Sequence, residues 1–122
     1  DLHSFPTRRS SDLVVEFCSL NYKLNLIAMQ MFKIIIAGGR HFLDYKLLSG
    51  EVEKFITEQT HGREIEIVTG GATGADTLGF KFGALHKLKN TVFPAEWDKY
   101  GRSAGPRRNK QMARYANALV AS

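Results

Sequence analysis

A strand–helix–strand pattern runs through EIEIVTGGATGADTLGFKFGALHKLKNTVFPA (64–95). Its first part, residues 64–71, alternates apolar and polar side chains before it reaches glycines, which predicts a strand. Residues 74–89 carry apolar side chains at helical spacing, which predicts a helix. Residues 90–95 then predict a short strand, which a proline ends. Strands joined through a helix favour parallel pairing with a right-handed crossover. The apolar stripe of the predicted helix consists of Leu78, Phe82 and Leu85.

The same alternation of strand and helix continues on both sides of this unit. KIIIA (33–37) is a continuous β-branched run, as expected for a strand buried on both faces, and a helix over about 45–60 follows it. A helix over 106–117 and a strand over 118–121 close the pattern. We therefore predict an α/β fold, a three-layer Rossmann-like doubly wound parallel sheet. Asp44 is the expected helix cap, and the expected inward residues are Leu48, Val52, Phe55, Ile56, Met112, Tyr115 and Ala116.

Length and composition indicate one soluble domain with an anionic partner. The chain has 122 residues, of which 43% are hydrophobic and 24% charged, enough for a core and unlike a disordered chain. Its net charge of +5 favours nucleic acid or a phosphorylated small molecule as partner. Cys18 is the only cysteine, which excludes an internal disulfide and favours a reducing, cytoplasmic location. No apolar run approaches the roughly 18 residues of a membrane span, so we expect no membrane partner.

The two ends of the chain differ from the regular middle. Residues 1–30 begin DLHSFPTRRSSDL, which has no helical or strand period and resembles a translated sequencing-adapter read-through. We interpret 1–30 as a non-native or disordered leader and 31–122 as the domain, with Met29 or Met31 as the expected start. The sequence stops at Ser122, directly after a predicted strand, whereas ligands of such sheets sit beside the loops that follow strands. We therefore expect a C-terminal truncation that removes part of the ligand pocket.

A glycine-rich loop lies between the second predicted strand and the second predicted helix. Glycines permit positive φ and close approach of a ligand, and the helix start offers N–H groups and a positive dipole end. This favours a phosphate site, although a plain helix start with a tight turn stays the alternative. Thr73 is the expected N-cap, with Asp76 at the third helical position. The candidate ligand-binding residues here are Gly70, Gly71, Ala72, Thr73, Gly74, Ala75 and Asp76.

Two further segments carry candidate phosphate ligands. Gly38, Gly39 and Arg40 follow the first strand, where the arginine can bind a phosphate with two hydrogen bonds or simply face solvent. Residues 99–114 contain six bases and no acid. With Pro106 expected to open the last helix, its first turn would hold cations against the helix dipole, which favours a bound anion over a solvated basic face. The candidates here are Arg107, Arg108 and Asn109, with Trp97 and Tyr100 as rings that stack on a base or pack at the sheet edge.

Three segments together resemble the YspA-type (YpsA-related) branch of the SLOG superfamily, which also includes the LOG phosphoribohydrolases and DprA. They are KIIIAGGRHFLDY, IVTGGATGADTLG and FPAEWDKYGRSAGPRRNKQMARYANALVA, and they cover about residues 32–121. The resemblance implies a Rossmann-like domain that binds a nucleotide or nucleotide-derived ligand, such as an NAD or ADP-ribose derivative. It assigns the G-[SG]-R, GGAxGAD and RN motifs to positions 38–40, 70–76 and 108–109. The PGGxGTxxE motif of the LOG enzymes has no counterpart here, and position 107 is Arg where similar sequences have an aliphatic residue.

Three functions compete on this basis. The first is a domain that senses or processes a nucleotide-derived ligand, with no other cofactor and no metal expected. The second is DprA-like binding of single-stranded nucleic acid through the basic stretch, with Trp97 and Tyr100 stacking on bases. The third is hydrolysis of a base–ribose bond, for which Asp76 is the best-placed carboxylate, ahead of Glu96 and Asp98. Catalysis and homo-oligomerisation are left open by the sequence.

Overall fold

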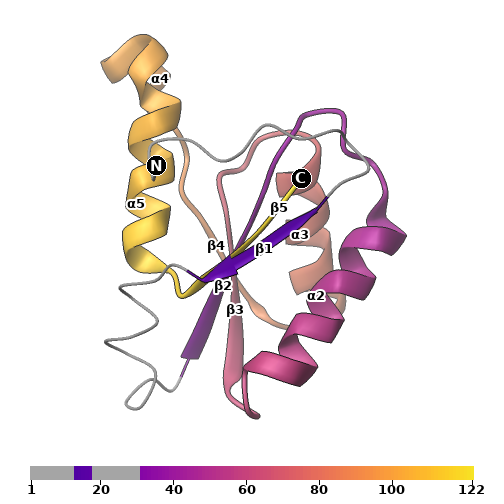
Figure 1. Cartoon of the computed structure of the whole chain (residues 1–122). Coiled ribbons are helices and arrows are strands. Elements are labelled where there is room, and N and C mark those ends of the chain that lie inside the picture. Colours follow the sequence, from indigo (N-terminus) through magenta and orange to yellow (C-terminus); the bar gives the residue numbers. More distant parts are fainter. Residues whose placement is uncertain (1–12, 18–30) are drawn as a thin grey trace.

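The computed structural model describes residues 13–17 and 31–122, which form a three-layer α/β fold (Figure 1). One five-stranded sheet has the strand order β1-β5-β2-β3-β4. The predicted Rossmann-like fold class is confirmed. The elements are β1 (Val14–Phe17), β2 (Met31–Ala37), α2 (Tyr45–Gln59), β3 (Glu64–Thr69), α3 (Ala75–Leu85), β4 (Lys89–Val92), α4 (Trp97–Tyr100), the 3₁₀ turn η1 (Gly101–Ser103), α5 (Ala104–Tyr115) and β5 (Ala118–Ala121).

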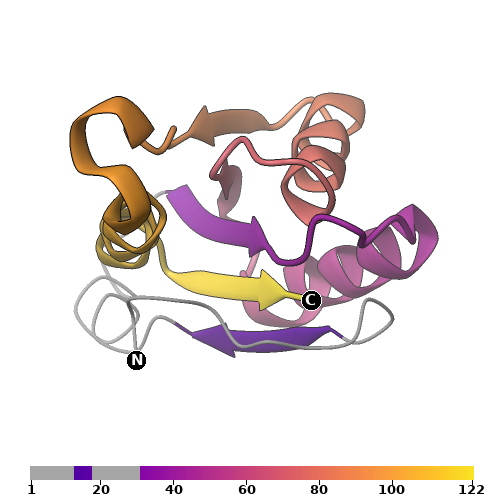
Figure 2. The ribbon, with the colours of Figure 1, turned by 90° about the horizontal axis from the view of Figure 1, so that it is seen from above.

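The chain winds in two directions from the central strand β2. It pairs in parallel with β3 on one side and with β5 on the other, and β3 pairs in parallel with β4. Seen from above in Figure 2, α2 and α3 lie on one side of the sheet and α5 lies on the other. This is the doubly wound arrangement that right-handed crossovers produce when the strand order reverses.

The residues of β2 are buried on both faces, which explains their continuous apolar run. Phe32, Ile34 and Ile36 pack under α2 and α3, whereas Ile35 and Ala37 pack against α5. Successive strand residues point to opposite faces, so a central strand covered on both sides favours apolar residues on both faces, here from Ile34 to Ala37.

Strand β1 is an element that the sequence analysis missed. It pairs antiparallel with β5, from Val14 opposite Ala121 to Phe17 opposite Ala118, and forms the edge of the sheet. Four residues interrupted by Glu16 give too short an alternation to predict a strand. The domain boundary at residue 31 stays a prediction, and residues 1–12 and 18–30 lie outside the described part of the chain.

Helix α3 ends earlier than predicted, and its stripe is shorter. Lys87 adopts a left-handed φ of +56°, and the amide of Leu88 donates to the carbonyl of Gly83 at 2.8 Å. With the bond from Lys87 N to Ala84 O, this is a Schellman ending that has lysine where glycine is usual. The prediction that Leu85 continues the apolar stripe of this helix is wrong, since Leu85 is 62% exposed.

Two helix starts also differ from prediction. The N-cap of α3 is Gly74 rather than Thr73, and Asp76 occupies the second helical position rather than the third. Helix α5 begins at Ala104 because η1 leads directly into it, which places Pro106 third instead of first. Within the described residues, no helix is long and apolar enough to cross a membrane.

Candidate functional site

A pocket of about 500 Å³ opens where β2, β3 and β4 end at their carboxyl edge. Such an edge is where doubly wound sheets bind ligands, and the volume lies within the range of about 300–1,000 Å³ for small-molecule sites. The pocket unites three loops that are distant in sequence. Its lining residues are Arg40, Gly70, Gly71, Ala72, Thr73, Val92, Pro94, Ala95, Trp97 and Arg108.

Asp76 braces the glycine-rich loop from its buried side. Its carboxylate is 4% exposed and accepts hydrogen bonds from the amides of Gly70 at 2.9 Å and Ala72 at 3.4 Å. Burial raises the pKa of Asp76 above its ordinary value, against the opposing effects of these hydrogen bonds and of the positive charge of Arg108. The carboxylate thus shapes the loop and is not among the groups that line the pocket.

Gly74 holds the glycine-rich loop against the loop that follows β2. Its φ is +81°, and a Cβ there would lie 2.6 Å from the carbonyl carbon of Arg40. The next amide, of Ala75, donates to the carbonyl of Gly39 at 3.3 Å. Close packing of two backbones therefore requires glycine at position 74, and the approach of a ligand to this residue stays a prediction.

Gly38 performs a similar task at the end of β2. Its φ is +145°, and a Cβ would lie 2.8 Å from the backbone nitrogen of Ser122. The hydroxyl of Ser122 accepts from the amide of Gly39 at 2.8 Å. Gly38 and Gly39 therefore join the ends of β2 and β5 and are not among the residues that line the pocket.

Arg108 connects α5 to two of the loops. Its Nη1 donates to the carbonyl of Gly70 at 2.6 Å and to that of Phe93 at 3.4 Å, while its Nε donates to Oδ1 of Asn109 at 2.9 Å. A Cβ at position 70 would collide with this guanidinium, so a side chain there would displace Arg108 from the carbonyl. Asn109 acts here by orienting Arg108.

The basic run lies further along the last helix than predicted. Arg107 and Arg108 are the fourth and fifth residues of α5 instead of its second and third, although the guanidinium of Arg107 reaches back to its N-cap, Ser103. Arg107 is exposed, donates to Oγ of Ser103 at 3.1 Å and covers the ring of Tyr100 at 4.2 Å, outside the pocket lining. Arg40, in contrast, is exposed and lines the pocket.

Sequence reasoning missed the apolar wall that β4 and the segment after it contribute. Val92, Pro94 and Ala95 line the pocket together with Trp97, for which packing at the sheet edge was an open interpretation. Their position after the third predicted strand was the available signal, because the carboxyl ends of parallel strands meet at one edge. No chemical motif marks such apolar residues in the sequence.

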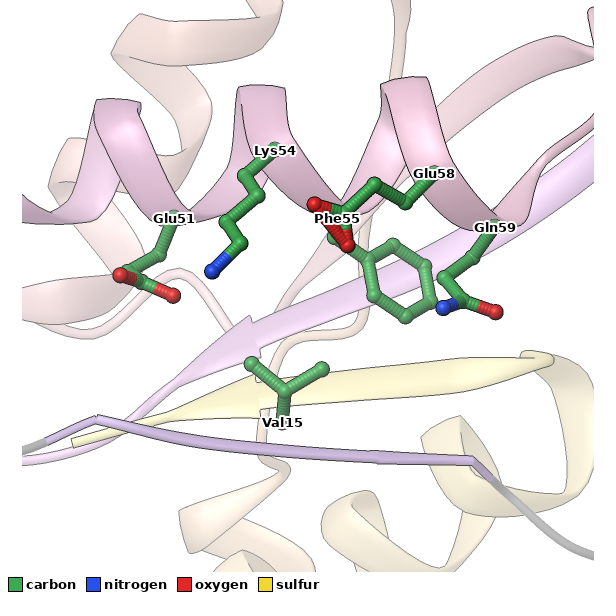
Figure 3. A pocket seen from close by; sticks show the side chains of 6 residues that line it. All are labelled: Val15, Glu51, Lys54, Phe55, Glu58 and Gln59. Atoms are coloured by element: carbon green, nitrogen blue, oxygen red, sulfur yellow. The ribbon is translucent and has the colours of Figure 1, made fainter.

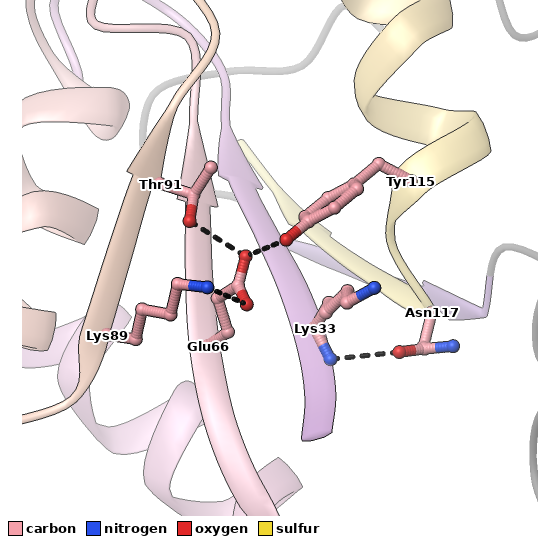
Figure 4. Close-up of polar contacts among 6 residues, drawn as sticks. All are labelled: Lys33, Glu66, Lys89, Thr91, Tyr115 and Asn117. Atoms are coloured by element: carbon pink, nitrogen blue, oxygen red, sulfur yellow. Dashed lines mark hydrogen bonds and ion pairs between the residues drawn. The ribbon is translucent and has the colours of Figure 1, made fainter. Parts of the chain in front are cut away.

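A buried carboxylate ties the far end of α5 to the sheet (Figure 4). Glu66 of β3 is 1% exposed and accepts from the hydroxyls of Tyr115 at 2.5 Å and Thr91 at 2.8 Å, with Nζ of Lys89 at 3.5 Å. Burial, and then the hydrogen bond to Glu66, raise the pKa of Tyr115. Helix α5 is therefore held by Arg108 near its start and by Tyr115 at its end.

A second hollow of about 270 Å³ lies between β1 and α2 (Figure 3). It has acidic, basic and apolar side chains, including Val15, Glu51, Lys54 and Phe55, and no glycine-rich loop. Within residues 13–17 and 31–122, no cluster of three or more His, Cys, Asp or Glu side chains could hold a metal ion. The pocket beside the Gly70 loop is therefore the stronger candidate site.

One comparison with known proteins identifies the family of the chain. No curated protein and no solved structure matches the chain. A family model described as the YspA, cpYpsA-related SLOG family matches residues 32–100, more than half of the sequence, and confirms the resemblance seen in its motifs. The chain belongs to the YspA, cpYpsA-related SLOG family.

Proposed function

We propose that the pocket binds a nucleotide or nucleotide-derived ligand, such as an NAD or ADP-ribose derivative, with its phosphate beside the Gly70–Thr73 loop. Membership of the SLOG family supports binding of nucleotide-related ligands in general. The observation that carries the proposal is the composition of the pocket lining. It holds two arginines and the glycine-rich loop but no carboxylate, and an apolar wall completes it.

The start of α3 supports a phosphate in this position. Its N-cap is a glycine, so no side-chain oxygen caps the helix. Asp76 accepts from the amides of Gly70 and Ala72, which precede the helix. The first helical amide, of Ala75, already donates to the carbonyl of Gly39, so α3 attracts an anion mainly through its dipole. The exposed residues Gly71 and Thr73 line the adjoining pocket.

The two pocket arginines have different roles in this proposal. Arg108 holds two backbone carbonyls, so it places the loop and adds positive potential. Arg40 extends from the loop after β2 and is exposed, so it can close on a phosphate with paired hydrogen bonds. Arg40 is therefore the residue whose loss should affect affinity most directly.

The two competing functions find less support in the geometry. Hydrolysis through Asp76 requires a carboxylate in contact with the ligand, yet this group is 4% exposed and hydrogen-bonded within the loop. Binding of single-stranded nucleic acid uses successive aromatic rings on which bases stack. The ring of Tyr100 already makes cation–π contacts with Lys99 at 5.0 Å and Arg107 at 4.2 Å, so it is less available to a base.

Calorimetric titration tests the proposal with ADP-ribose, NAD and inorganic phosphate as probes. Arg40→Gln should weaken the binding of the nucleotide probes by about 1.5–3 kcal/mol, the scale of a charged hydrogen bond. The matched control is Lys46→Gln, which removes an exposed cation from α2 outside the pocket and should leave affinity unchanged. Equal losses in both variants, or no binding of any probe, would contradict the proposal.

A salt titration separates a mononucleotide from a strand. Single-stranded nucleic acid binding should lose affinity with a log–log slope of about −0.7 per neutralised phosphate, accumulated over several phosphates. A ligand with one or two phosphates should show a correspondingly shallow slope. A steep slope with an oligonucleotide that binds more tightly than the probes above would favour the nucleic-acid function.

A further inference from the structure

We propose that Trp97 is a stacking platform for an aromatic ring, so that the site selects phosphate esters that carry a flat heterocycle over bare sugar phosphates. This inference rests on the proposed function, because it concerns the same pocket. Trp97 opens the short helix α4, lines the pocket and is 55% exposed. A large apolar side chain left exposed inside a pocket is a typical feature of ligand recognition.

The indole is backed by the start of α5. Gly105 is buried, and a Cβ built there would lie 3.4 Å from Cη2 of Trp97. One edge of the ring thus rests against α5, while more than half of the side chain stays accessible. A ring supported in this way loses little conformational freedom when a second ring stacks on it.

Polar and apolar groups of the pocket come from different elements. Arg40 and the glycine-rich loop follow β2 and β3, and Arg108 comes from α5, whereas the apolar residues Val92, Pro94 and Trp97 come from β4 and the segment after it. A ligand that satisfies both parts needs a phosphate at one end and an apolar planar group at the other. Nucleoside phosphates have this composition, and a sugar phosphate lacks the second part.

The number of available rings favours a single base over a strand. Trp97 is the one aromatic side chain in the pocket lining, and the nearby ring of Tyr100 is covered by Lys99 and Arg107. Proteins that bind single strands stack successive bases on several aromatic residues. One platform beside one phosphate loop fits one base.

Three probes separate the parts of the ligand in the full chain: AMP, ribose 5-phosphate and inorganic phosphate. The wild-type protein should bind AMP about 5- to 150-fold more tightly than ribose 5-phosphate, the range for base–aromatic stacking. Trp97→Ala should abolish this preference and leave the affinity for ribose 5-phosphate unchanged, while Trp97→Phe should keep most of it. Phe80→Ala is the matched control, since Phe80 is a 47% exposed aromatic residue of α3 outside the pocket.

Fluorescence gives an independent readout, because Trp97 is the only tryptophan in the chain. AMP should change its emission, and ribose 5-phosphate should not. Equal affinities of the wild-type protein for AMP and ribose 5-phosphate would overturn the Trp97 platform and leave the phosphate site standing. Failure of all three probes to bind would overturn the proposed function and this inference with it. Trp97-dependent binding of oligothymidylate that strengthens with length would overturn the single-base assignment.

Discussion

The guanidinium of Arg108 joins α5 to the glycine-rich loop, because its Nη1 lies 2.6 Å from the carbonyl oxygen of Gly70, 38 residues earlier in the chain. The same nitrogen reaches the carbonyl of Phe93, so one side chain spans the ends of β3 and β4. An arginine that looks like a ligand contact in the sequence is thus also a structural link. The rim of the pocket depends on it.

Arg108→Gln should destabilise the free protein by about 1–3 kcal/mol, because a buried carbonyl loses its charged donor. The helix-dipole argument from the sequence gives the opposite sign, since it places this cation in the first turn. Urea unfolding measures the difference. Arg107→Gln is the control and should cost less than about 1 kcal/mol, the scale of its exposed contact with Tyr100. A stabilised Arg108→Gln would restore the dipole interpretation.

Gly74→Ala should destabilise the protein by about 2 kcal/mol or more. The methyl group would enter the backbone of Arg40, and φ of +81° with ψ of −128° is a conformation reserved for glycine. Gly39→Ala is the matched control, because a Cβ there meets nothing within 4 Å. Thermal unfolding of both variants checks the pair, and similar melting temperatures would disprove the close packing of the two loops.

Tyr115→Phe should cost about 1.5–3 kcal/mol, since it removes a hydrogen bond to the buried carboxylate of Glu66. Tyr45→Phe removes a buried hydroxyl that has no hydrogen-bond partner in the described part of the chain. It should be neutral or stabilising. Chemical denaturation of the two variants compares them directly, and equal costs would remove the special role of the Glu66 contact.

Asp76 should make stability depend on pH in the acid range. Its pKa is raised in the folded state, so its contribution to stability is complete below the ordinary value of 3.8 and is lost as the pH rises through the folded pKa. The free energy of unfolding of Asp76→Asn minus that of the wild type should therefore increase as the pH rises above about 3.8. Urea unfolding between about pH 3 and pH 7 measures this difference, and a difference that decreases with rising pH would contradict the prediction.

The sequence predicted the strands and helices best where the burial of apolar side chains alone determines the pattern. The run KIIIA and the apolar stripes of the helices identify the strands and helices, because burial on both faces of a central strand leaves no alternative to apolar residues. The motifs at positions 38–40 and 70–76 predict a site at the edge of the sheet where the pocket of about 500 Å³ opens. Their contribution to ligand contacts stays a prediction.

Sequence patterns were least informative where tertiary contacts decide the outcome. Leu85, expected on the apolar stripe of its helix, is the exposed last residue of α3. Arg108 is predicted, with Asn109, to face a ligand, and the structure adds that the carbonyls of Gly70 and Phe93, which directly follow β3 and β4, hold its guanidinium in place. The position of Gly74 likewise follows from the backbone of Arg40, a contact between loops that local patterns do not contain.

Titration of the ¹⁵N-labelled protein with AMP, followed by two-dimensional NMR, tests the central claim most directly. The account predicts the largest shifts at the amides of Gly70, Gly71 and Thr73, at Arg40, and at the indole N–H of Trp97. Shifts that are confined to the hollow between β1 and α2, or no shift at millimolar AMP, would contradict it.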